Sequence, residues 1–165
     1  MWSPSLSRCA ERRAGSPGSA SRRTLLGASV GIATLLIVRP AAATPEGMEA
    51  AIRKFAGGAA IGRGRVTLDI PVLVENGNSV PVVVAVDSPM TEADHVTAIA
   101  LFNQRNPLPE IALFQLGPRS GKAWVSTRIR LGDSQTIAAV ARMSDGSIWS
   151  ASTELIVTLP ACIES

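Results

Sequence analysis

Short apolar runs separated by turn residues fill the chain from Arg65 onward, and this pattern constrains the fold more than any other feature. Between the runs stand pairs such as Asn76-Gly77 and Asp145-Gly146, which favour tight turns. The number and spacing of the runs predict an all-β protein of about seven strands, folded as a β-sandwich. The expected strands are Val66 to Val74, Val80 to Val86, Val96 to Phe102, Ile111 to Leu116, Ala123 to Leu131, Thr136 to Met143 and Ile148 to Leu159.

The run from Ala123 to Leu131 shows how one of these strands is expected to lie. Its residues alternate in polarity, so that Val125 and Ile129 fall on one face and Trp124 and Arg128 on the other. Such alternation is typical of a strand that is buried on one side only. We interpret Trp124, like Trp149, as a core or interface residue.

One short helix is expected before the strands. Between Thr44 and Gly58, the apolar residues Met48, Ile52 and Phe55 recur at helical spacing. The pair Gly57-Gly58 then ends the pattern. We therefore expect a small helix that lies on the sandwich, within a domain that covers residues 44–159.

Residues 1–43 have the features of an export signal. The pair Arg22-Arg23 precedes an apolar run, Leu25 to Val38, and small residues follow at Ala41 to Ala43. The arginine pair indicates a twin-arginine signal, and an ordinary secretory signal is the alternative. The apolar run is about 14 residues long, whereas a membrane-spanning helix needs about 20. We therefore expect an exported protein without a membrane anchor.

Removal of this leader changes the charge of the chain. The full sequence has a formal net charge of +3, with 16 basic and 13 acidic residues. Six of the basic residues and one acidic residue lie in the leader, so the mature chain would carry a net charge of −2. Without a basic cluster, nucleic acid is not an expected partner.

Cys162 is the one cysteine that the mature chain would keep, because Cys9 lies in the leader. It stands beyond the last expected strand, on a tail that follows Pro160. A leftover cysteine in an oxidising compartment suggests an intermolecular bond or a reactive thiol. The nearby Glu164 is expected to raise the pKa of this thiol above its ordinary value of about 8.5, so fast chemistry would need activation by a partner.

Other chemistry finds little support in the sequence. The single histidine, His95, leaves no multi-histidine metal site, and we interpret the segment from Thr91 to His95 as a polar turn. Gly62 and Gly64 do not form a phosphate loop, and there is no nucleophile elbow. We expect neither a cofactor nor an independent enzymatic activity.

Several segments together resemble the SoxY family, the carrier proteins of the bacterial Sox system for thiosulfate oxidation. They are Arg53 to Gly58, Val74 to Val82, Asp87 to Val96, Val125 to Leu131 and Val140 to Ser147. The resemblance implies an immunoglobulin-like sandwich, a periplasmic location and a heterodimer with a SoxZ-like subunit. It also implies three further partners: a haem-containing sulfur transferase, a sulfate-releasing hydrolase and a sulfane dehydrogenase.

In this family the chain ends in a Gly-Gly-Cys-Gly-Gly arm, and the sulfur substrate is attached to its cysteine. The resemblance places Cys162 at the cysteine position, in an arm of residues 160–165. Pro160 and Ala161 replace the first glycine pair, and Ile163 and Glu164 replace the second. These changes give a stiffer arm with bulkier flanks, because proline fixes its own φ and glycine is the most permissive residue.

Three interpretations remain open from the sequence. In the first, Cys162 is a working attachment site. In the second, the protein is a SoxY-like paralogue without carrier activity, which acts as a structural or interaction module. In the third, it is a periplasmic accessory domain of a different dehydrogenase system.

Overall fold

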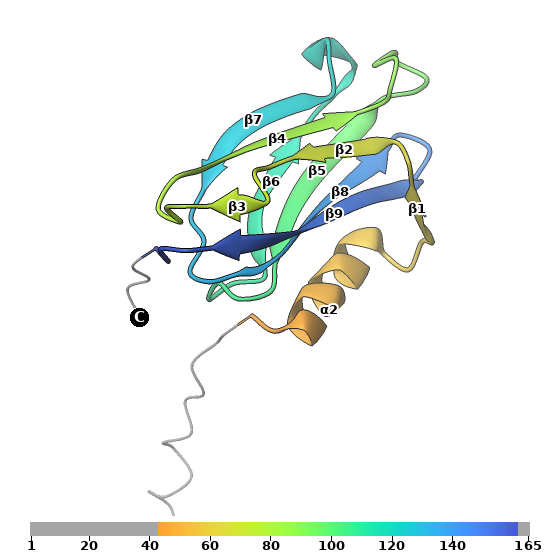
Figure 1. Ribbon diagram of the computed structural model, residues 1–165. Helices are drawn as coiled ribbons and strands as arrows, with labels where there is room; N and C mark the ends of the chain where they lie inside the picture. Colours follow the sequence, from red (N-terminus) through yellow and green to blue (C-terminus); the bar gives the residue numbers. More distant parts are fainter. Residues whose placement is uncertain (1–42, 162–165) are drawn as a thin grey trace, which may run out of the picture. The chain divides into compact units, whose positions relative to one another are not determined.

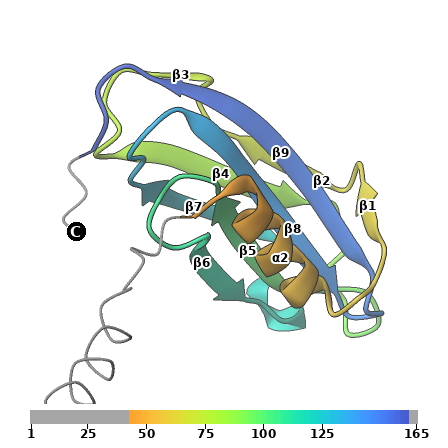
Figure 2. The ribbon, with the colours of Figure 1, turned by 90° about the horizontal axis from the view of Figure 1, so that it is seen from below.

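The computed structural model describes residues 43–161, so the leader up to residue 42 and the last four residues lie outside the described part. The described chain forms a two-layer β-sandwich with one α-helix (Figures 1 and 2). No helix among these residues is both long and apolar enough to cross a membrane. The elements are α2 (Pro45–Ala56), β1 (Ile61–Arg63), β2 (Val66–Asp69), β3 (Leu73–Val74), β4 (Val80–Val86), β5 (Val96–Asn103), β6 (Glu110–Gln115), the 3-10 helix η1 (Pro118–Ser120), β7 (Trp124–Ile129), β8 (Gln135–Met143) and β9 (Ile148–Val157).

The larger sheet has the strand order β1-β9-β8-β5-β6, and β3 also pairs with β9. Its central strands are antiparallel, whereas β1 and β3 each run parallel to β9. The smaller sheet has the order β2-β4-β7 and is antiparallel throughout. The predicted all-β sandwich is therefore confirmed, with nine strands in the described residues where about seven were expected.

Two strand predictions need correction. The single strand expected over Val66 to Val74 is split, because β2 belongs to the smaller sheet and β3 pairs with β9 in the larger one. Pro71 stands between them, and proline cannot donate to a ladder. The short strand β1, with Gly62 at its centre, was not predicted from the sequence. A Cβ at Gly62 would come within 2.8 Å of the Trp149 ring, so this strand depends on the absence of a side chain.

The hydrophobic core lies between the two sheets. In β4 the inward residues are buried and the outward ones are more exposed, which is the alternation of a strand with one solvent face. In β5 and β8 nearly every residue is buried, because helix α2 covers their outer face. β7 shows the alternation that its sequence predicts, with Ile129 buried and Trp124 exposed.

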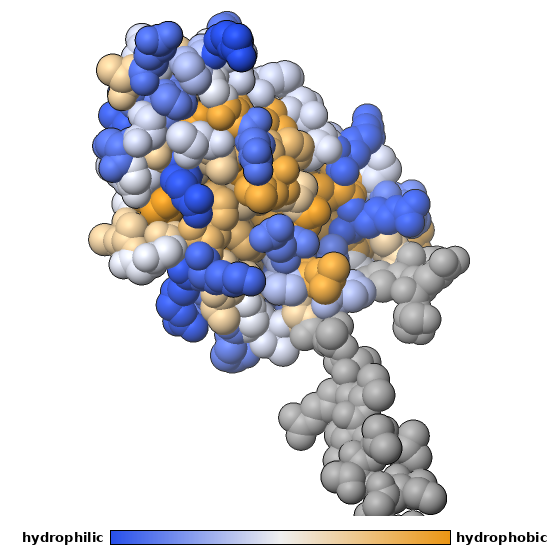
Figure 3. Space-filling view, turned by 180° about the vertical axis from the view of Figure 1, so that it is seen from behind, coloured by the Kyte–Doolittle hydropathy of each residue, from blue (hydrophilic) through white to orange (hydrophobic). Residues whose placement is uncertain are grey.

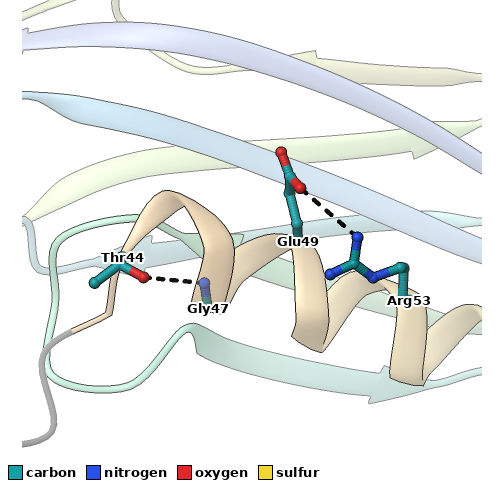
Figure 4. A network of polar contacts seen from close by, with 4 residues as sticks. All are labelled: Thr44, Gly47, Glu49 and Arg53. Carbon is teal, nitrogen blue, oxygen red and sulfur yellow. Dashed lines mark hydrogen bonds and ion pairs between the residues drawn. The ribbon is translucent and has the colours of Figure 1, made fainter.

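Helix α2 begins and ends close to the predicted residues. Thr44 is the N-cap, and its hydroxyl accepts a hydrogen bond from the Gly47 amide at 3.1 Å (Figure 4). Gly57 closes the helix in the left-handed conformation, with φ at 62°. An exposed ion pair between Glu49 and Arg53, 3.8 Å apart, joins successive turns of the helix.

Aromatic and cationic contacts fix the helix on the larger sheet. The rings of Phe55 and Phe102 meet edge to face, with centroids 6.0 Å apart. The guanidinium of Arg142 lies 4.5 Å from the centroid of Phe55 and donates a hydrogen bond to the Phe55 carbonyl. Small residues on β5 and β8, Ala100 and Ala138, let the helix approach closely.

Candidate functional site: the root of the C-terminal arm

The predicted attachment site, Cys162, lies outside the described residues, as do Ile163 and Glu164 of the arm. The other two arm residues are described. Pro160 is exposed, whereas Ala161 is only 6% exposed and lies against the sandwich. The first part of the segment that the sequence predicts as an arm is therefore held by the body of the protein.

The segment that leads from β9 to the arm runs beside β3. Strand β9 ends at Val157, and the next residue, Thr158, continues the ladder by donating its amide to the Val74 carbonyl at 2.9 Å. The Thr158 hydroxyl donates to the same carbonyl at 3.1 Å. β3 and the segment that follows it thus guide the chain out of the sheet.

Three backbone hydrogen bonds then hold the chain, and we call them the clasp. The Gly77 amide donates to the Leu159 carbonyl at 2.8 Å, and the Leu131 amide donates to the Gly77 carbonyl at 2.8 Å. The Ala161 amide donates to the Leu131 carbonyl at 2.9 Å. The clasp joins three segments that are far apart in the sequence and fixes the backbone of the residue before Cys162.

Glycine is required at position 77 because three backbones meet there. A Cβ added at Gly77 would lie 2.3 Å from the Leu131 carbonyl oxygen and 3.0 Å from the Ala161 nitrogen. Both contacts are with backbone atoms, which cannot move away as the end of a flexible side chain does. Gly77 is not among the residues with positive φ, so close approach is the physical reason for this glycine.

A partly buried polar network supports the clasp from the side of Leu131. The Asn106 side chain donates to the Arg130 carbonyl at 2.7 Å and accepts from the Gly132 amide at 3.2 Å. It also accepts from the amide group of Gln135, which is 4% exposed, at 3.1 Å. Asn106 therefore fixes the backbone on both sides of Leu131, whose own side chain is fully buried.

Four large aliphatic side chains are exposed beside the clasp, and we call them the arm-side surface. They are Val72, Leu73, Ile156 and Leu159, each between 57% and 60% exposed. Leu73 and Ile156 are directly paired across β3 and β9, so their side chains lie next to each other on the outer face. A shallow hollow of about 310 Å³ adjoins them, lined by residues that include Leu73, Glu75 and Asn76.

A second apolar area lies on the side of the protein that carries β6, where Figure 3 shows hydrophobic residues gathered at the centre of the face. Leu113 on β6 is 47% exposed, and the neighbouring Ile111 and Phe114 are partly buried against the core. β6 is an edge strand of the larger sheet, so it has no strand partner on its outer side within the described residues. We call this area the β6 surface.

The segment from Thr91 to His95 forms a turn, in line with its interpretation from the sequence. The Thr91 hydroxyl accepts from the Asp94 amide at 3.1 Å, and the His95 ring nitrogen Nδ1 lies 3.0 Å from the Thr91 carbonyl oxygen. Within residues 43–161, no group of three or more histidine, cysteine, aspartate or glutamate side chains is arranged to hold a metal ion.

Two exposed carboxyl groups have shifted pKa values, and neither belongs to the clasp. Hydrogen bonds from the Ser147 hydroxyl and then the Ser147 amide, which is 2.8 Å from the carboxylate oxygen, lower the pKa of Asp145. A hydrogen bond from its own backbone amide, followed by one from the Thr44 side chain, lowers the pKa of Glu46. Both carboxylates stabilise turns or helix ends rather than a reaction site.

Comparison with protein families gives a match to the model described as "Sulfur oxidation protein SoxY", over residues 52–162. The match covers most of the sandwich and ends on Cys162. The chain belongs to the SoxY family. No curated protein matches the chain.

The chain is also similar to solved structures, one of them a SoxY protein. The sulfur carrier protein SoxY from Chlorobium limicola f thiosulfatophilum is 29% identical, with a TM-score of 0.59, and the match covers 70% of this chain and all of that one. A superoxide reductase (neelaredoxin) from Ignicoccus hospitalis is 20% identical, with a TM-score of 0.51, and the match covers 70% of this chain and 94% of that one. The second likeness shows the fold alone. Membership of the SoxY family supports a carrier role in sulfur oxidation.

The sequence did not reveal the residues that hold the arm. The pair Asn76-Gly77 was predicted as a turn, but its hydrogen bonds with Leu131 and Leu159 join positions more than fifty residues apart. The arm-side surface was hidden because Val72, Leu73 and Ile156 looked like ordinary strand residues. A usable signal was the proline at position 71, which divides a strand that would otherwise have been buried on one side.

Proposed function

We propose that this protein is a periplasmic covalent sulfur carrier, which holds thiosulfate-derived intermediates on Cys162 and acts with a SoxZ-like subunit. The observation that carries the proposal is the SoxY-family match, because it runs through the sandwich and ends on this cysteine. The clasp adds a physical reason: it presents the residue before the thiol at a fixed place on the surface.

The proposed chemistry needs no catalytic group on this chain. In the first step the Cys162 thiol and thiosulfate form an S–S bond, releasing one proton and two electrons to the haem-containing sulfur transferase. The product is a thiol-bound S-thiosulfonate. Water then cleaves its terminal S–S bond in the hydrolase, which releases sulfate and leaves a persulfide on Cys162 for the sulfane dehydrogenase.

The residues on the two sides of the cysteine have different consequences for this role. Pro160 and Ala161 belong to the held segment, where backbone freedom is not needed. Ile163 and Glu164 would have to enter the partner enzyme with the thiol, and an unpaired carboxylate is costly to desolvate. We therefore expect the cognate enzymes to offer Glu164 a cationic or hydrogen-bonding group.

The carrier role is tested by Cys162→Ser in a thiosulfate-oxidising host whose own copy of this gene is deleted. We expect the variant to fold and to be exported, and thiosulfate-dependent growth and sulfate release to be lost. The matched control is Ser165→Ala in the same tail, which should restore both. Normal sulfate release by Cys162→Ser would show that the sandwich serves as an interaction module without a carrier thiol.

A further inference from the structure

Helix α2 and strand β1 leave a cleft between them on the outer face of the larger sheet. In Figure 2 the helix lies over β5 and β8, and β1 lies on the far side of β9. The cleft has a volume of about 380 Å³. Because small-molecule sites commonly measure about 300–1,000 Å³, this cleft suits a ligand at the small end of that range.

The strand register places the floor of the cleft on the face that the helix covers. Ser152 is paired with Ala138 across β9 and β8, and Ala138 packs beneath α2, so both side chains lie on this outer face. Ser150 lies two residues before Ser152 on the same face and is directly paired with Arg63 of β1. Serine side chains are short, so the floor stays low beside the helix and the cleft stays open.

The two walls of the cleft carry opposite charges. On the β1 side, Arg63 is exposed and forms no ion pair among the residues that the structure describes. On the helix side, Glu49 lies 3.8 Å from Arg53, but the two side chains are 67% and 69% exposed, and such surface pairs contribute little. Glu49 can therefore change its partner at a small cost. At the floor, the hydroxyl groups of Ser150 and Ser152 can each donate or accept a hydrogen bond.

Apolar side chains complete the lining. Met48 and Ile52 belong to α2, Ile61 belongs to β1 and Ala138 to β8. Burial of an aliphatic group against these side chains is favourable, since it removes apolar surface from water. The cleft thus combines one cation, one carboxylate, hydroxyl groups and an apolar surface within the space of a small molecule.

We propose that this cleft binds a small aliphatic amino acid in its zwitterionic form. Arg63 and the Ser150 hydroxyl hold the carboxylate of the ligand, and Glu49 accepts hydrogen bonds from its ammonium group. The aliphatic side chain lies against Met48. A purely anionic ligand would face the carboxylate of Glu49, and a purely cationic one would face Arg63, so a zwitterion is the charge type that both walls accept. The inference goes beyond the sulfur carrier role and does not rest on it.

The experiment titrates the purified, isotope-labelled protein with L-leucine and follows its amide resonances. Two analogues with a single charge are the matched probes, since isocaproate lacks the amine and isoamylamine lacks the carboxylate. We expect L-leucine to shift the amide signals of Ser150 and Ser152 in a saturable manner. It should bind at least tenfold more tightly than either analogue, because each analogue loses one charged contact and meets one charge of its own sign.

Substitutions in the lining assign the contacts. Arg63→Gln and Glu49→Gln should each weaken the binding of L-leucine about tenfold. Glu49→Gln should also bind isocaproate more tightly than the wild type does, because it removes the opposing carboxylate. Ser150→Leu should abolish binding, since its side chain fills the floor. The matched controls are Lys54→Gln and Glu154→Gln, which remove one charge each outside the lining and should keep the wild-type affinity.

Three results would overturn the proposal. The first is equal affinity for L-leucine and isocaproate, which would make the cleft a simple anion site. The second is the absence of saturable shifts at Ser150 and Ser152 in the wild type. The third is wild-type affinity in Arg63→Gln, which changes an exposed side chain and therefore remains informative even if Ser150→Leu does not fold.

Discussion

Two turns in this protein share a sequence pattern and differ in what they do. In each, an Asn or Asp side chain accepts from the amide two residues ahead, at 2.9 Å for Asn76 and 2.8 Å for Asp145, and a glycine stands between. Gly146 has φ at 83° and open space around it, so its backbone conformation requires glycine. Gly77 requires glycine because other backbones crowd it.

One turn makes only local contacts, whereas the other also makes long-range contacts. The Asp145-Gly146 turn joins β8 to β9, neighbours in the chain and in the sheet, so its whole effect is local. The Asn76-Gly77 turn joins β3 to β4 and also forms hydrogen bonds with Leu131 and Leu159, and Leu131 in turn accepts from the Ala161 amide. The same short pattern can therefore close a hairpin or organise a functional end of the protein.

Among the substitutions that test this difference between the turns, Gly77→Ala should have the largest effect. We expect it to lower the free energy of unfolding by about 3 kcal/mol, because its Cβ would overlap backbone atoms on two sides. The amide of Ala161 should exchange with solvent much faster, as its bond to Leu131 is lost. Chemical denaturation and hydrogen exchange measure the two effects, and wild-type protection of Ala161 would contradict the clasp.

Asn106→Ala should have the next largest effect. Removing this side chain takes away the hydrogen bond to the Arg130 carbonyl and the one from the Gln135 side chain. We expect the free energy of unfolding to fall by about 1–2 kcal/mol. Because the clasp itself is intact, Ala161 should be deprotected less than in Gly77→Ala. The matched control is Asn78→Ala, which loses only a local bond to Asn76, and equal effects in the two variants would contradict the supporting network.

Gly146→Ala tests whether the other turn has only a local effect. The alanine must adopt a left-handed backbone, which costs about 1 kcal/mol. The strain stays within the hairpin, so exchange of the Ala161 amide should match the wild type. A thermal or chemical unfolding curve gives the first result. Deprotection of Ala161 in this variant would show that the two turns are coupled.

The smallest effect is expected from Asp145→Asn, and it depends on pH. The pKa of Asp145 is lowered from its ordinary value of 3.8, so the charged form stabilises the fold. This contribution is fully present above the ordinary pKa and is lost as pH falls through the lowered one. The stability difference between wild type and variant should therefore shrink as pH falls below about 4. A difference that does not change with pH would contradict the role of the carboxylate.

Most of the body was predictable because its signals are local. The helix is set by Thr44, Gly57 and its apolar spacing, and β7 follows its own alternation. The split between β2 and β3 was harder, because both halves have strand residues and only Pro71 hints at the change of sheet. β1 was missed since Gly62 is an unlikely strand residue until the ring of Trp149 is packed on it.

The arm root was predictable only in part. Cys162 and its flanking residues were predicted from the resemblance, whereas Leu159 and Ala161 are held by backbone groups at positions 77 and 131, respectively. Backbone hydrogen bonds leave no residue type as a signature, apart from the glycine that makes room for them. Exposure of Val72 and Ile156 follows from the parallel pairing of β3 with the end of β9, which no local pattern encodes.

The most direct test of the account is intact-mass spectrometry of the mature protein from the native host grown on thiosulfate, before and after reductant. We predict additions of sulfur, sulfonate or thiosulfonate mass that map to Cys162 and disappear with reductant. An unmodified thiol, or only a disulfide-linked dimer, would contradict the carrier role.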